Sequence, residues 1–358
     1  MSTSSATTGA PAAGTTIRQV VLGTDGDVRL ERAEPPGAPG PEEVLLAPVR
    51  LGICGSDVHV LDKAHPFIAP PVVTGHECAA RVVAVGPAVG NCAPGDLVVV
   101  NPLVTCGDCE RCRGGRANQC DAAKVLGFAV PGAARERFLV EQRYCHRVPA
   151  GLTAGAAVLA EPLAVGWHAV RRGPDRLGRV LILGGGPVGL AVLDAAVARG
   201  ADHITVVEPV ASKRALAAAL GAHRVLDPQD GDGPAPADTV FDCVAAPATL
   251  RTAATAAVPG GTLVVVGVPS GDRSLPLARL QRWEIDVRGT GLYLGADIDA
   301  VLARLAADDS ISRALVTAEF PVARAAEAFT ATRDPEQVKV TLAWPDPAEP
   351  PSAEPAAG

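Results

Sequence analysis

The chain has 358 residues, 48% of them hydrophobic, and a formal net charge of −7. One hydrophobic core rarely serves so long a chain, so we expect two domains. An acidic chain lacks the positive field that concentrates nucleic acid or anionic lipid, and we expect neither as a partner. The N-terminal stretch has no basic segment followed by an apolar run, and charged residues interrupt the later apolar runs. These features predict a cytoplasmic protein without a membrane span.

The two ends of the chain, residues 1–16 and 345–358, are rich in Pro, Ala and Ser. They contain too little apolar surface to offset the entropy of ordering, so we expect both to be disordered. Between residues 17 and 150, short β-rich runs such as EVLLAPVRLGI and DLVVV are separated by Gly and Pro. This pattern predicts an all-β first domain with functional loops.

From residue 151 to 291, apolar strands such as VLIL and ITVV alternate with Ala/Leu-rich helical stretches. This alternation predicts βαβ units, a parallel sheet and a nucleotide-binding domain. Residues 292–344 contain two helical patterns and the strand VKVTLAW, which could return to the first domain. The predicted fold class is therefore α/β with an all-β portion.

Four of the nine cysteines lie close together in a polar loop, with the spacing C-x2-C-x2-C-x7-C. They are Cys106, Cys109, Cys112 and Cys120. Four thiolates can close a tetrahedral shell around zinc and leave no position for substrate, so we expect a structural zinc site. An iron-sulfur cluster is the main alternative, but ferredoxin-type spacing has a shorter last gap and a Pro after the fourth Cys, where this chain has Asp121.

A glycine-rich turn, G-x-G-x-x-G, lies between the strand VLIL and the helix that follows it. Its residues are Gly184, Gly186, Pro187, Val188 and Gly189. The glycines permit a tight turn, a close approach of backbone to a pyrophosphate and close helix packing. The helix N-terminus adds a favourable positive potential. The turn therefore predicts a dinucleotide site.

Glu208 follows the next strand and lies nineteen residues beyond Gly189. Its carboxylate can accept both hydroxyl protons of the adenosine ribose and would repel a 2′-phosphate, which predicts NAD rather than NADP. Lys213 could reach a ribose or phosphate oxygen. Arg214 could do the same or could simply lie at the solvated surface of its helix.

Further candidate ligands are scattered over three segments, GICGSDVH, TGHE and EPLAVGWH. Each alone is weak evidence, because lone Cys, His and Glu residues usually have structural or surface roles. In combination they are stronger evidence, because the motifs occur along the chain in the order found in one known protein family. That order is GICGSDVH, GHE, the four-cysteine segment, EPLAV and GGGPVG. The chain resembles the zinc-containing medium-chain alcohol and polyol dehydrogenases over residues 17–344.

The resemblance implies a GroES-like domain, a Rossmann domain and a catalytic zinc in the cleft between them. By motif match, the zinc ligands would be Cys54, His76 and Glu77. Glu161, in EPLAV, would either bind the metal or hold its water. The pair of His76 and Glu77 is similar to the sorbitol, threonine and sugar-alcohol branches of the family.

The resemblance also implies a mechanism, in which zinc acidifies the substrate hydroxyl and hydride passes to NAD. Ser56 would pass the proton from the alcohol toward His59, because an imidazole titrates near working pH. His59 could instead be a loop residue that packs on the cofactor. Asp57 would orient a metal ligand rather than carry protons. We expect oxidation of a secondary alcohol to a ketone, or the reverse reduction.

The identity of the substrate stays open at this stage. Sorbitol-type enzymes have an Arg that binds substrate hydroxyls where this chain has Leu292, before Tyr293. A leucine cannot donate hydrogen bonds, so a cyclic polyol or aminocyclitol, a sugar acid or a simpler alcohol fits better than sorbitol.

Two other functions compete with this interpretation. One is a catalytically silent NAD-binding regulator, and the other is a zinc-free quinone or enoyl reductase. The presence of the full ligand and relay set argues against both. The family also implies a homodimer or homotetramer, formed through a strand near IDVRGT.

Overall fold

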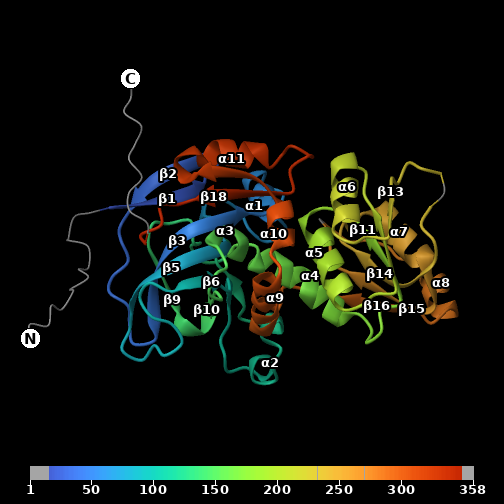
Figure 1. Ribbon diagram of the computed structural model, residues 1–358, viewed down its shortest axis with the longest axis horizontal. Coiled ribbons are helices and arrows are strands. Elements are labelled where there is room, and N and C mark those ends of the chain that lie inside the picture. The colour runs from blue at the N-terminus through green and yellow to red at the C-terminus, as the bar shows by residue number, and fades with distance from the viewer. Residues whose placement is uncertain (1–15, 232, 270, 349–358) are drawn as a thin grey trace, which may run out of the picture.

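The chain folds into two sheet-based domains with helices between them (Figure 1). The computed structural model describes residues 16–231, 233–269 and 271–348. Most of the two ends that we predicted to be disordered lies outside the described residues. Residues 345–348 are described, and there Asp346 forms an ion pair with Arg81 at 3.1 Å.

The first domain is built from short strands. Its strands are β1 (Ile17–Leu22), β2 (Val28–Ala33), β3 (Glu43–Ile53), β4 (Val72–Val73), β5 (Glu77–Val85), β6 (Leu97–Val100), β7 (Leu103–Val104), β8 (Lys124–Val125), β9 (Phe138–Glu141), β10 (Cys145–Arg147), β17 (Val316–Pro321) and β18 (Lys339–Ala343). Seven of them form one sheet in the order β10-β6-β5-β3-β18-β17, with β9 also paired to β3. The last segment of the chain thus returns to the first domain, where Figure 1 shows β18 in red among blue strands.

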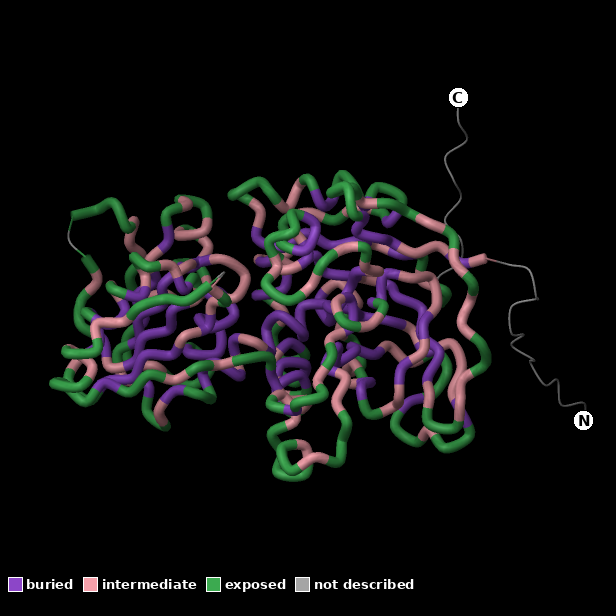
Figure 2. Tube along the Cα trace, turned by 180° about the vertical axis from the view of Figure 1, so that it is seen from behind, coloured by how far each residue is buried: buried purple, intermediate pink, exposed green. Residues whose placement is uncertain are grey.

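Short helices accompany these strands. They are α1 (Gly55–Leu61), α2 (Glu110–Arg113), α3 (Ala154–Ala157) and α11 (Ala325–Ala331), with single 3₁₀ turns η1 (Ala117–Gln119), η2 (Gln142–Tyr144) and η3 (Val322–Arg324). The largest of the buried residues in the core of this domain include Leu22, Leu46, Leu51 and Phe138. Figure 2 shows the buried strands enclosed by exposed loops.

The second domain is a parallel sheet with helices. Its strands are β11 (Arg179–Leu183), β12 (His203–Val207), β13 (Arg224–Leu226), β14 (Ala237–Asp242), β15 (Ala257–Val265) and β16 (Asp286–Gly289). Its helices, and those that join it to the first domain, are α4 (Ala160–Arg172), α5 (Pro187–Ala198), α6 (Ala211–Ala219), α7 (Pro247–Ala256), α8 (Leu277–Arg282), α9 (Gly295–Ala307) and α10 (Ser310–Leu315). The strand order is β13-β12-β11-β14-β15-β16, and all pairs are parallel. The order reverses at β11, which is the arrangement of a doubly wound nucleotide-binding sheet. The predicted fold class is confirmed.

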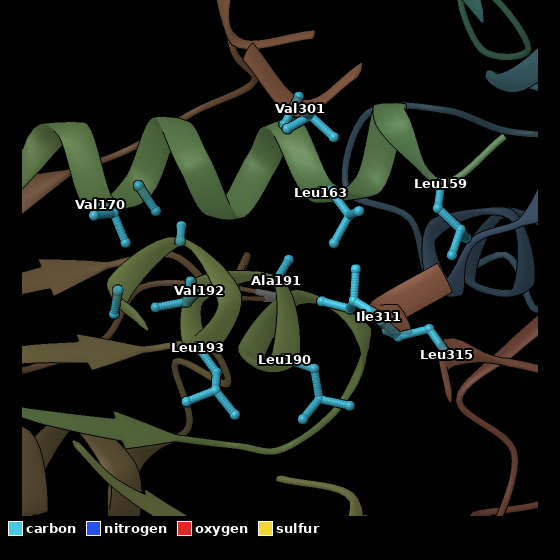
Figure 3. Close-up of a cluster of buried hydrophobic side chains, with 14 of the residues drawn as sticks. Leu159, Leu163, Val170, Leu190, Ala191, Val192, Leu193, Val301, Ile311 and Leu315 are labelled. Carbon is cyan, nitrogen blue, oxygen red and sulfur yellow. The ribbon is translucent and has the colours of Figure 1, made fainter. Parts of the chain in front are cut away.

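A shared hydrophobic core joins the two domains through α4 (Figure 3). Leu163 of α4 and Leu190 of α5 belong to the same buried cluster as Val99 of the first domain. Gly166 permits the close contact of these two helices, because a Cβ there would lie 2.3 Å from the backbone carbon of Ala191. The first turn of α4, which carries Glu161, is therefore packed into the core that the two domains share.

The strand order also explains which chain segments meet at the candidate site. Because β3 runs antiparallel to β5 and to β18, its C-terminal end lies beside their N-terminal ends. In this register Gly52 is opposite Glu77, and Ile53 is opposite Val340. Among the described residues, no helix has both the length and the apolar character needed to cross a membrane.

Candidate active site

Cys54, His76 and Glu77 converge where β3 ends and β5 begins. One potential ligand atom from each of the three lies within 4.8 Å of the others. His76 and Glu77 are buried, and Cys54 is half-buried. Gly52 makes room for this cluster, because a Cβ at residue 52 would lie 1.8 Å from Oε2 of Glu77. The structure thus brings together the three residues that were predicted to bind the catalytic zinc.

Asp57 supports this cluster from the first turn of α1. Its Oδ2 accepts a hydrogen bond from the backbone N–H of Cys54 at 3.0 Å, and its Oδ1 accepts from the Thr74 hydroxyl at 2.7 Å. Nδ1 of His76 lies 3.6 Å from the same Oδ1, which leaves Nε2 as the outward ligand atom. This separation is longer than a hydrogen bond, so the orienting role of Asp57 toward a metal ligand stays a prediction.

A buried lysine lies directly behind Glu77. Nζ of Lys339, on β18, lies 2.6 Å from Oε1 of Glu77 and donates to the Ile53 carbonyl at 3.3 Å. The two side chains are 3% and 1% exposed. Burial opposes the charge of Lys339, but Glu77 and Cys54 keep its pKa above the ordinary value. Lys339 therefore fixes one oxygen of Glu77 and leaves the other free.

The free atoms of the cluster fit a divalent cation. Oε2 of Glu77 has no hydrogen-bond partner within the described part of the chain, although it is fully buried. Burial lowers the pKa of His76, but Asp57, Cys54 and Glu161 outweigh this effect and raise it well above its ordinary value. The surroundings thus attract positive charge. Thiolate, imidazole and carboxylate together are a ligand set suited to zinc, with three protein ligands and one open position.

Glu161 lies near this cluster but is not one of the three converging residues. It is buried in the first turn of α4, and its Oε1 accepts a hydrogen bond from the Tyr293 hydroxyl. Burial raises the pKa of Glu161 to about 7, with His76 lowering it and Glu77 raising it further. Burial and the nearby Glu161 carboxylate also raise the pKa of Tyr293 well above its usual value. Direct binding of metal by Glu161 stays a prediction.

The predicted proton-relay residues lie on α1, directly after Cys54. Ser56 is half-buried and His59 is exposed. They are three positions apart on one helix, so their side chains lie on the same side of it. A hydroxyl and a solvent-exposed imidazole thus lie on one side of the helix that begins directly after Cys54.

The four-cysteine segment, residues 106–120, forms a lobe around α2 and η1 at the lower edge of Figure 1. Sγ of Cys106 lies 3.9 Å from Sγ of Cys112 and 3.5 Å from Sγ of Cys120. Sulfur atoms that share one tetrahedral zinc would be about 3.8 Å apart, given a Zn–S distance of about 2.3 Å. All four sulfurs, including that of Cys109, lie within 4.8 Å of one another. The lobe therefore fits a structural zinc.

The glycine-rich turn joins β11 to α5. Gly184 has φ +95°, and a Cβ at Gly189 would lie 1.9 Å from the Gly184 carbonyl oxygen. Larger residues therefore cannot occupy either position. Gly186 caps α5, and Pro187 occupies its first turn, a position at which a missing N–H costs nothing. Val188 lies within that first turn, so all five predicted residues lie where β11 ends and α5 begins.

Glu208 connects this turn to β12. Its Oε2 accepts from the Gly185 N–H at 2.7 Å, and its Oε1 accepts from the Val210 N–H at 2.9 Å. Lys213 is half-buried on α6. Arg214 contacts the Glu208 carbonyl at 2.7 Å and Asp227 at 2.9 Å, so its guanidinium holds the loop after β12.

Some residues of the site were missed in the sequence. Lys339 is one of only four lysines in the chain and interrupts the apolar strand VKVTLAW, which is a signal that could have revealed it. Gly52 gave no signal, because its role depends on the register that places it opposite Glu77. Tyr293 was noted only as the neighbour of Leu292, and its contact with Glu161 joins positions 132 residues apart.

Comparison with known proteins indicates the same family as the resemblance found in the sequence. Residues 40–150 match the alcohol dehydrogenase GroES-like domain family, and residues 187–307 match the zinc-binding dehydrogenase family. Sorbitol dehydrogenase of Rattus norvegicus is 34% identical over 352 residues, covering 93% of this chain and 97% of that protein.

Two solved structures extend the comparison. A protein of Sinorhizobium meliloti described as a zinc-binding dehydrogenase, bound to NADP, superposes with a TM-score of 0.85 at 28% identity, covering 92% of this chain and 100% of that chain. L-Idonate 5-dehydrogenase of Escherichia coli has a TM-score of 0.82 at 26% identity, covering 92% and 98% respectively. Fold, site and relatives together define a zinc-type dehydrogenase. The chain belongs to the zinc-dependent medium-chain alcohol and polyol dehydrogenase family.

Proposed function

We propose that this enzyme oxidises a secondary alcohol of a cyclic polyol or sugar derivative to the ketone, with NAD as the hydride acceptor. The convergence of Cys54, His76 and Glu77, with a buried and unpartnered carboxylate oxygen, carries the proposal. Bound zinc would supply Lewis-acid activation of the substrate hydroxyl. The same residues would hold the metal, and Lys339 would keep Glu77 from rotating away.

The chain's own residues would then handle the proton. Ser56 Oγ would accept the proton of the substrate hydroxyl and pass its own toward His59. His59 is exposed at the outer end of α1 and can release the proton to solvent. Glu161, buried and held by Tyr293, would orient a water or a substrate hydroxyl beside the metal ligands.

The choice of a cyclic substrate rests on an aromatic wall beside the cluster. The ring of Phe128 lies between those of His65, at 5.2 Å, and His76, at 4.9 Å. An aromatic face packs well on the C–H face of a ring. Leu292, which is 37% exposed next to Tyr293, adds apolar surface where an arginine would bind the hydroxyls of an open chain. Both features favour a cyclitol or sugar ring over sorbitol.

The choice of NAD rests on Glu208. Its carboxylate is fixed by two backbone N–H groups at the end of β12 and can still accept further hydrogen bonds from ribose hydroxyls. A 2′-phosphate would approach this negative charge, which disfavours NADP. The Sinorhizobium meliloti relative binds NADP, so the preference of this chain needs a direct test.

A homodimer is the proposed assembly. β16 is an edge strand of the parallel sheet, with exposed apolar side chains on it and beside it. They are Val268, Leu277, Trp283 and Val287. An unpaired edge with apolar neighbours favours pairing with a second copy. Light scattering that shows a monomer at working concentration would contradict this assembly.

The experiment is NAD and NADP reduction by the purified, zinc-loaded enzyme across cyclitols, sugar acids, open-chain polyols and simple alcohols. We expect the highest kcat/KM with a cyclic substrate and NAD. A higher kcat/KM with sorbitol would overturn the substrate class, and a higher kcat/KM with NADP would overturn the role of Glu208. Two bound zincs without turnover of any alcohol would overturn the activity itself.

A further inference from the structure

The segment that joins β16 to α9, residues 290–294, forms part of the site but has no helix or strand of its own. It carries Leu292, which has φ +53°, and Tyr293, which is 1% exposed and donates to Glu161. A left-handed conformation is costly for a leucine, so other contacts must hold the backbone there.

The four-cysteine lobe supplies one of these contacts through Asn118. Nδ2 of Asn118 donates to the Gly291 carbonyl at 3.0 Å and lies 3.3 Å from Nε2 of His168, on α4. An amide NH₂ group has two hydrogens, and the two acceptors use both. His168 is buried and lies between the lobe and α9.

The other end of the segment is held by Asp297. Its Oδ2 accepts the Leu294 N–H at 2.8 Å, lies 3.0 Å from Nδ1 of His168 and accepts from Arg171 at 3.0 Å. A proton on Nδ1 of His168 satisfies Asp297 and leaves Nε2 as the acceptor for Asn118. One continuous network thus fixes the segment at Gly291 and at Leu294, on either side of Leu292 and Tyr293.

We propose that Asn118 is a positioning residue, through which the four-cysteine lobe sets the substrate-binding geometry of Leu292 and Tyr293. Asn118 lies on η1, two residues before Cys120, in the polar segment that carries the four cysteines. The lobe therefore positions the Asn118 amide, this amide donates to the Gly291 carbonyl, and the Tyr293 hydroxyl donates to Glu161. The kinetic part of this inference rests on the proposed function, and the structural part does not.

The test compares Asn118→Asp with Gln119→Glu. Both changes turn an amide into a carboxylate at neighbouring positions of η1, but Gln119 is exposed and only Asn118 donates to Gly291. Asn118→Leu removes the donors without adding charge, in case the new carboxylate disturbs the lobe. All variants should retain the zinc content of the wild type.

Hydrogen exchange of a peptide covering residues 290–298 is the first readout, and it needs no substrate. We expect about tenfold faster exchange in both Asn118 variants, because one hydrogen bond that holds the segment is lost, and wild-type exchange in Gln119→Glu. The second readout is kinetic. The KM for the alcohol should rise about tenfold while the KM for NAD is unchanged, whereas a general loss of folded enzyme would lower kcat alone.

The proposal would be overturned if the Asn118 variants showed the same exchange rate of this peptide and the same KM for the alcohol as Gln119→Glu. An equal rise of both KM values would also overturn it, because the effect would then not be local to the substrate side. If the wild type turns over no alcohol, the proposed function fails, but the exchange experiment still decides the role of Asn118.

Discussion

The two cysteine-containing clusters of this enzyme are assembled in opposite ways. The lobe takes its four ligands from fifteen consecutive positions, Cys106 to Cys120, in an exposed loop. The other cluster takes Cys54, His76 and Glu77 from two strand ends and depends on Lys339, which lies 262 residues beyond Glu77. We therefore expect the first to need metal to hold its loop together, and the second to be held by the sheet whether or not metal is present. A local cluster can thus be recognised from spacing, whereas a long-range cluster requires the fold.

The largest expected effect is that of His76→Ala. Loss of this ligand should abolish metal binding at the strand-end cluster and lower kcat/KM by about a thousandfold or more, because Lewis-acid activation is worth several kcal/mol. Zinc per chain should fall from about two to about one, as measured by atomic emission. The lobe should keep its metal. Loss of both metals from His76→Ala would show that the two sites are not independent.

Lys339→Met tests whether the strand-end cluster is preformed. Removing the lysine leaves a buried carboxylate without its partner, so the free energy of unfolding of metal-free protein should fall by about 3 to 5 kcal/mol. Zinc should restore part of the lost stability, because the bound cation would balance the negative charge of Glu77 in place of the Lys339 ammonium. Urea titrations with and without zinc measure both effects.

Lys124→Met is the matched control for this substitution. Lys124 is exposed on β8, so its replacement should change stability by less than about 0.5 kcal/mol. Equal stabilities of the two methionine variants would show that the pair of Lys339 and Glu77 does not hold the site.

The same contrast explains what could be predicted from the sequence. The alternation of strands and helices after residue 151, and the turn from Gly184 to Gly189, follow from local periodicity and turn chemistry, so the fold class was predictable. The four-cysteine lobe was predictable from spacing alone. The strand-end ligands were found only through resemblance, because nothing local distinguishes His76 from a packed histidine.

The remaining parts of the site depend on register and on contacts between distant segments. Gly52 matters because it lies opposite Glu77, and Asn118 matters because the lobe meets the segment before α9. Neither relation leaves a periodic or compositional trace in the chain. His168 belongs to no metal-binding or catalytic motif, and it is buried within the network that links Asn118 to Asp297.

The smallest expected effect is a difference in how pH changes zinc affinity at the two clusters. A backbone hydrogen bond from Cys106 lowers the pKa of Cys120 to about 7, and a hydrogen bond with the Asp108 side chain raises that of Cys106 to about 12. Zinc binds thiolates, so protons compete with it, and affinity must fall as pH falls. Four thiols must lose protons to bind zinc in the lobe, but only the Cys54 thiol and the His76 imidazole, whose pKa is raised, must do so in the strand-end cluster. Acidification from pH 8 to pH 6 should therefore weaken the lobe more steeply, by more than about tenfold per pH unit.

Single-site proteins make this difference measurable. His76→Ala retains only the lobe, and Cys112→Ser retains only the strand-end cluster, so each can be titrated against a chromophoric zinc chelator across the same pH range. We expect the steeper dependence of log affinity on pH in His76→Ala, because more protons leave for each zinc bound. Parallel slopes would mean that the lobe thiols are already deprotonated before metal arrives. The lobe would then be preformed, like the strand-end cluster, and the distinction between a site made by its metal and a site made by its sheet would be lost.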